Sequence, residues 1–151
     1  MSYVLILEDD PTMAEWLQGV IQREFGMTVT SVELLETESE FRLRWVPEFD
    51  AGRRLTPACI VIDVMLRWTD PAPDQPVRPL DVVEGGHIRA GFRCQHEIMR
   101  HPRLRGIPVT LFTSLTPEEC QRLGFDLKGV DLVNKDDGQR IVYSLRRALM
   151  A

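Results

Sequence analysis

The chain has 151 residues, of which 44% are hydrophobic and 27% charged, and its formal net charge is −5. These values are ordinary for one globular domain with a sizeable core, and the acidic balance disfavours nucleic acid as the main partner. The sequence contains no apolar run long enough to span a membrane and no basic region followed by an apolar signal core. We therefore expect a cytoplasmic protein without a membrane partner.

Four short apolar runs are each followed directly by polar residues that carry chemistry. The runs cover residues 4–7, 59–62, 109–112 and 130–133, and continuous apolar runs are typical of strands in a parallel sheet covered on both faces. Because the carboxyl ends of parallel strands share one edge of a sheet, the residues after the runs are expected to converge there. These residues include Glu8, Asp9, Asp10, Asp63, Thr113, Ser114, Asn134 and Lys135.

Helical patterns alternate with the strands along the whole chain. In chain order we expect a strand over 1–7, a helix from Pro11 ended by Gly26, a strand over 27–32 and a helix over 34–46. A loop over 47–57 follows, and then a strand ending at Asp63, a helix over 91–100 and a strand over 109–112. The chain continues with a short helix capped by Thr116, a strand over 129–133, and a last helix capped by Asp136 or Asp137.

Five alternating strand and helix segments predict an α/β fold. With right-handed crossovers they form a doubly wound five-stranded parallel sheet with helices on both faces. Of the two common strand orders, five strands suit 2-1-3-4-5, the flavodoxin-like order. We expect a single domain over 1–151.

The segment 67–90 is unusual for such a domain. It contains four of the ten prolines and the pair Gly85–Gly86, and it far exceeds the usual 2–6 residues of a connection in α/β units. We interpret it as an insertion that lies over or beside the strand ends, with Trp68 near the site. The alternative is a flexible surface excursion.

The polar strand ends resemble those of the receiver domain of two-component response regulators. The resemblance covers nearly the whole chain, and it also implies the 2-1-3-4-5 strand order. The motifs that carry it are Ile6-Leu7-Glu8-Asp9-Asp10-Pro11, Ile60-Val61-Ile62-Asp63, Ile107-Pro108-Val109 through Thr113-Ser114, and Lys135.

The resemblance implies a role for each matching residue. Asp63 would take a phosphoryl group from the phosphohistidine of a sensor histidine kinase or a histidine phosphotransfer protein. Mg²⁺ would be held by Glu8, Asp9, Asp63 and the main-chain carbonyl of Met65. Lys135 would pair with one phosphoryl oxygen, and the Thr113 hydroxyl would bond another.

Two positions depart from the family pattern. Asp136 stands where a proline commonly follows the lysine, and Leu132 replaces the aromatic residue that often acts as a switch.

The leading interpretation is a single-domain response regulator, not a turnover enzyme. It would dock onto a downstream protein through its fourth helix, fifth strand and fifth helix; homodimerisation is left open. The first alternative is a pseudo-receiver module that acts without phosphorylation. The second is a haloacid-dehalogenase-like phosphatase, which would need an Asp where Met65 stands.

Overall fold

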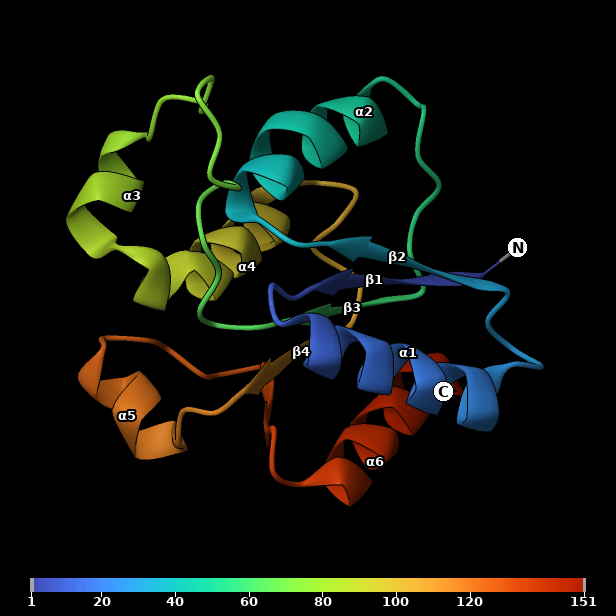
Figure 1. Ribbon diagram of the computed structural model, residues 1–151. Helices are drawn as coiled ribbons and strands as arrows, with labels where there is room; N and C mark the ends of the chain where they lie inside the picture. The colour runs from blue at the N-terminus through green and yellow to red at the C-terminus, as the bar shows by residue number, and fades with distance from the viewer. Residues whose placement is uncertain (1, 151) are drawn as a thin grey trace.

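The computed structural model describes residues 2–150 and contains one five-stranded sheet in the order β2-β1-β3-β4-β5 (Figure 1). All neighbouring strands are parallel. The predicted fold class and strand order are therefore confirmed. The strands are β1 (Tyr3–Leu7), β2 (Ser31–Leu35), β3 (Cys59–Ile62), β4 (Val109–Thr113) and β5 (Asp131–Asn134).

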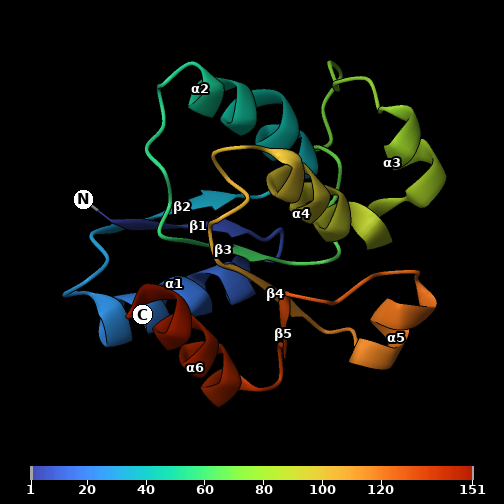
Figure 2. The ribbon, with the colours of Figure 1, turned by 180° about the vertical axis from the view of Figure 1, so that it is seen from behind.

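Helices cover both faces of this sheet (Figures 1 and 2), as the patterning predicted. One face packs against α1 and α6, and the other against α2 and α4. The helices are α1 (Pro11–Phe25), a π-helical turn (Glu40–Trp45) that runs into α2 (Val46–Asp50), α3 (Leu80–Gly85), a 3₁₀ turn (His87–Arg89), α4 (Ala90–Arg100), α5 (Pro117–Arg122) and α6 (Gly138–Leu149). Within residues 2–150, no helix is long and apolar enough to cross a bilayer.

The strands can be apolar on both faces because helices cover the sheet from both sides. All four residues of β3 are buried, with alternate side chains directed into the two cores. Ile60 and Ile62 pack in the core under α2 and α4, while Cys59 and Val61 pack under α1 and α6. The sheet is thus held from both sides, which fixes the positions of the strand ends.

The first and last parts of the chain match the sequence expectations closely. Asp10 accepts hydrogen bonds from the first turn of α1, and Gly26 follows the helix as predicted. Thr116 and Glu119 form a reciprocal capping box at α5. Of the two candidate caps for α6, Asp137 is the one whose side chain accepts from the backbone. Met1, where we began the first strand, lies outside the described residues.

The second strand was predicted too early in the chain. Residues 27–30 form the turn after α1, where Thr28 and Val29 both donate to the Phe25 carbonyl. The strand begins at Ser31, and its pairing with β1 places Leu34 opposite Ile6. We had assigned Leu34 and Leu35 to a helix, but pairing with the central strand outweighs their helical spacing.

The second helical region consequently lies later than predicted. It begins at Glu40, and its anchors Phe41 and Trp45 are fully buried, as expected. Pro47, which we had placed at the start of a loop, instead lies in the first turn of α2, directly after the π-helical turn. Helical structure therefore continues to Asp50.

The other boundary errors are small. The fifth strand begins at Asp131 rather than residue 129, and α4 begins one residue before the predicted start. The 67–90 segment is more ordered than a loop, because it contains α3 and the 3₁₀ turn. It lies at the end of the sheet opposite the N-terminus (Figure 1), where the strands end.

Candidate metal and phosphoryl site

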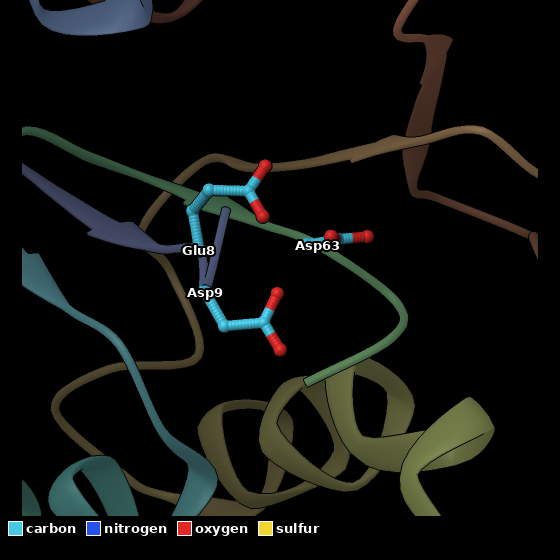
Figure 3. A group of neighbouring side chains, drawn as sticks. All are labelled: Glu8, Asp9 and Asp63. Atoms are coloured by element: carbon cyan, nitrogen blue, oxygen red, sulfur yellow. The ribbon is translucent and has the colours of Figure 1, made fainter. Parts of the chain in front are cut away.

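Three carboxylates lie together at the carboxyl edge of the sheet (Figure 3). Glu8 and Asp9 follow β1, and Asp63 follows the neighbouring β3. One oxygen of each carboxylate lies within 4.8 Å of the others. Carboxylate oxygens are the ligands that Mg²⁺ prefers, so these three residues fit a magnesium site. The sequence prediction that these three residues converge is confirmed.

Lys135 enters the same site from the end of β5. Its Nζ lies 2.6 Å from Oε1 of Glu8 and 2.8 Å from Oδ2 of Asp63. The Lys135 amide donates to the Thr113 carbonyl at 2.9 Å, so β4 fixes the start of the loop that carries this lysine. The ammonium therefore touches two of the three acids.

The site is short of positive charge. Glu8 and Asp63 are only 3% and 5% exposed. Burial, together with the hydrogen bond and the charge of Asp63, raises the pKa of Glu8 to about 8, although Lys135 opposes this shift. Burial alone would lower the pKa of Lys135, but its bonds to Asp63 and Glu8 raise it overall. A cation beside these acids would relieve their repulsion.

Thr113 is the last residue of β4 and is fully buried. Its hydroxyl oxygen accepts from the Leu115 amide at 3.3 Å. Met65 lies two residues after Asp63, and its amide donates to Oδ1 of Asp63 at 3.2 Å. The first contact fixes the loop after β4, and the second holds the Asp63 carboxylate. Coordination by the Met65 carbonyl and phosphoryl binding by Thr113 stay predictions.

Gly91 is a positioning residue that the sequence reasoning read only as a helix start. The Gly91 amide donates to the Val64 carbonyl at 2.8 Å, directly behind Asp63. A Cβ atom at Gly91 would overlap the Asp63 carbonyl oxygen and the Val64 Cα. Only glycine lets α4 approach the strand end this closely. The signal in the sequence was a glycine early in a helix without a capping role.

Arg67 was also missed as an individual residue. Its amide donates to Oδ2 of Asp9 at 3.1 Å, and its Nη1 donates to the Asp9 carbonyl at 3.3 Å. The expectation that the 67–90 segment lies beside the strand ends is therefore correct at its first residue. Trp68 is buried, and its indole donates to the Pro76 carbonyl at 3.0 Å, within the segment itself.

The two departures from the family pattern lie on the β5 side of the site. Asp136 is exposed, and its amide donates to the side chain of Asn134 at 2.8 Å. Leu132 is partly buried and packs against the core under α2 and α4. Neither residue makes a side-chain hydrogen bond within residues 2–150, and both leave Lys135 in contact with the acids.

Comparison with known sequence families finds no match, and neither does comparison with curated proteins. Solved structures do match. A response regulator from Chloroflexus aurantiacus J-10-fl, described as putative, is 20% identical with a TM-score of 0.65, covering 99% of this chain and 98% of that one. The receiver domain of a histidine kinase from Syntrophus aciditrophicus is 24% identical with a TM-score of 0.61, covering 99% and 91%.

A third match is the receiver domain of a sensor histidine kinase from Pseudomonas aeruginosa PAO1, with a magnesium ion coordinated in its active-site cleft. It is 18% identical with a TM-score of 0.55, covering 99% of this chain and 98% of that one. The chain therefore has the fold of response regulator receiver domains, as its motifs predicted.

Proposed function

We propose that this chain is a phosphoacceptor in which Asp63 takes a phosphoryl group from a phosphohistidine, with Mg²⁺ bound by Glu8, Asp9 and Asp63. The observation that carries the proposal is the position of the Asp63 carboxylate, between the Lys135 ammonium at 2.8 Å and the two other acids within 4.8 Å.

The chemistry follows from charge and position. A bond forms between an Asp63 oxygen and phosphorus while the bond from phosphorus to the histidine nitrogen breaks, and the neutral imidazole leaves. Mg²⁺, when bound, would neutralise charge on the phosphoryl oxygens. Lys135 would move from Asp63 to a phosphoryl oxygen, and Thr113 would donate its hydroxyl to another. Positioning and charge neutralisation supply most of the catalysis in such transfers.

The donor set supports magnesium as the ion. The Pseudomonas aeruginosa receiver domain holds Mg²⁺ in its active-site cleft, and a response regulator named Rcp1 has been solved with Mn²⁺ bound. Both are hard divalent cations that carboxylates bind. In this chain the same kind of ion would sit among Glu8, Asp9 and Asp63.

The partners follow from the same proposal. Two of the similar structures are receiver domains of histidine kinases, and a kinase or a histidine phosphotransfer protein is the donor we propose here. The output surface would be α5, β5 and α6, which dock onto a downstream protein in the cytoplasm. The chain would change its state once per phosphoryl group and would not turn over a substrate.

The test is incubation with acetyl phosphate and Mg²⁺, followed by intact-mass measurement. We expect an increase of about 80 Da, the mass of one phosphoryl group, in the wild type and in Asp136→Asn, and no increase in Asp63→Asn. Asp136 is a matched control because it is an exposed acid at the same edge. An adduct that persists in Asp63→Asn would show that another residue is the acceptor.

The pseudo-receiver alternative is favoured by one observation, the position of Leu132. A leucine packed against the core cannot swing inward on phosphorylation as an aromatic switch residue does. If this alternative is correct, the protein binds Mg²⁺ but gains no mass from acetyl phosphate or from a kinase. Release of phosphate from a generic phosphate ester would instead favour the phosphatase.

A further inference from the structure

The 67–90 segment is hydrogen-bonded directly to the proposed metal site. The Arg67 amide and guanidinium both bond Asp9, one at the carboxylate and one at the main-chain carbonyl. The same guanidinium pairs with Asp70 at 2.6 Å and with Glu36 at 3.7 Å. Arg67 therefore joins three separate parts of the chain, and one of them carries two of the three proposed metal ligands.

The main chain at Arg67 continues this connection away from the site. The Arg67 carbonyl accepts from the Glu38 amide at 3.0 Å, and the Trp68 carbonyl accepts from the Ser39 amide at 2.8 Å. Two consecutive residues of the segment thus bond two consecutive residues after β2. Arg67 therefore bonds Asp9 through its main-chain amide and Glu38 through its main-chain carbonyl.

Glu38 is itself the centre of a buried ion cluster. It is fully buried, and Arg93 of α4 bonds both of its carboxylate oxygens at 2.7 and 2.8 Å. Arg42 bonds Glu38 at 3.0 Å and reaches Asp81 of α3 at 3.0 Å. We call Glu38, Arg42, Arg93, Asp81 and Glu97 the Glu38 cluster. Through Arg42, this cluster ties α3 to Glu38, the residue whose amide also bonds Arg67 at the start of the segment.

We infer that Arg67 is a positioning residue for Asp9, and that the Glu38 cluster sets how firmly Arg67 holds Asp9. Mg²⁺ binding and the packing of the 67–90 segment through α3 therefore strengthen each other. The inference rests on the proposed metal site but not on phosphorylation of Asp63. The Arg67 guanidinium holds the Asp9 main chain and the Arg67 amide holds one Asp9 oxygen, so the carboxylate keeps its orientation toward Glu8 and Asp63. Because coupling is reciprocal, a change at α3 alters metal affinity, and metal binding protects α3.

The first test compares Arg67→Gln with Arg78→Gln. Arg78 is exposed in the same segment and makes no hydrogen bond or ion pair within residues 2–150. Loss of a positive charge near an acidic site would by itself tighten Mg²⁺ binding. We expect the opposite for Arg67→Gln, a dissociation constant about fivefold higher by calorimetry, and no weakening for Arg78→Gln. Equal or tighter binding in Arg67→Gln would overturn the positioning role of the Arg67 guanidinium.

The second test acts from the far end of the segment. Asp81→Asn removes the ion pair between α3 and Arg42, whereas Asp74→Asn removes the same charge from an exposed residue without a partner among the described residues. We expect about threefold weaker Mg²⁺ binding in Asp81→Asn and no change in Asp74→Asn. In hydrogen exchange, Mg²⁺ should protect amides 66–85 in the wild type, and less so in Asp81→Asn.

These measurements separate positioning from a merely structural role. If the cluster only stabilises the fold, Asp81→Asn lowers the melting temperature without Mg²⁺ but leaves the dissociation constant and the Mg²⁺-dependent protection unchanged. That result would overturn the coupling. If the wild type binds Mg²⁺ with this pattern but is never phosphorylated on Asp63, the inference stands and the proposed phosphoacceptor function fails.

Discussion

Two groups of buried charges lie on either side of Arg67, and they differ in how their charges are balanced. At the strand ends, Glu8, Asp9 and Asp63 face one ammonium, that of Lys135. In the Glu38 cluster, the one fully buried carboxylate meets two guanidiniums, and the other two acids lie near the surface. Burial is similar in both, since Glu8, Asp63 and Glu38 are 3%, 5% and 0% exposed.

The difference shows what distinguishes a binding site from a structural ion cluster in this molecule. Both oxygens of the Glu38 carboxylate are bonded by guanidiniums, so cations already compensate its charge. The acids at the strand ends carry two more negative charges than Lys135 neutralises when all are ionised, which matches one divalent cation. Compensation of the buried carboxylates by cations, and not burial or acid content, therefore assigns the two roles.

The largest effect should come from removing the buried carboxylate of the Glu38 cluster. Glu38→Ala leaves two guanidiniums partly buried without their partner, and removal of one member of a buried ion pair costs about 3–5 kcal/mol. We expect a loss of that size in the free energy of unfolding, measured by urea denaturation. Glu40→Ala is the control, because Glu40 is 32% exposed and pairs with Arg44 at 3.3 Å; its loss should stay below about 1 kcal/mol. Similar losses for both would contradict the comparison.

The next effect concerns the pH dependence of the metal-free protein. Folded Glu8 has its pKa raised by burial and by Asp63 to about 8, whereas in the unfolded chain the value returns to 4.5. Folding then takes up a proton between these pH values, so stability falls as pH rises through this window. We expect stability to fall by a few kcal/mol across this window, with the slope removed in Glu8→Gln. A slope that persists in Glu8→Gln would place its origin elsewhere.

Mg²⁺ should remove the charge imbalance and stabilise the fold by mass action. At ten times the dissociation constant the gain is about 1.4 kcal/mol, which raises the melting temperature of a domain of this size by a few degrees. Asp63→Asn should lose most of this shift, and Asp136→Asn should keep it. If Asp63→Asn gains as much as the wild type, the ion binds away from the acidic cluster.

The smallest effect should come from the exposed margin of the Glu38 cluster. Glu97 is 36% exposed and lies 3.3 Å from Nε of Arg42. Exposed pairs contribute little, so Glu97→Gln should cost about 0.5 kcal/mol or less in the same urea experiment. A cost close to that of Glu38→Ala would mean that the cluster acts as one unit, rather than through its buried carboxylate.

The acidic site could be predicted from the sequence because each of its residues directly follows a recognisable apolar run. Glu8, Asp63 and Lys135 needed only the rule that parallel strands end at one edge, together with the receiver-like order of motifs. The helix caps at Asp10 and Thr116 were equally local. The second strand was placed wrongly because its five residues are polar and apolar in a mixed order, and only pairing with β1 selects their register.

By itself, the sequence determined the fold class, the strand order with the help of the family resemblance, and the residues at the strand ends, because these depend on apolar runs and the residues adjoining them. Only the tertiary structure decided that Arg67 bonds Asp9, that Gly91 packs against Asp63, and that Glu38 receives Arg42 and Arg93. These contacts join residues up to 58 positions apart. No local pattern marks them, because the partner of a charged side chain is chosen by packing of the whole chain and not by its neighbours in sequence.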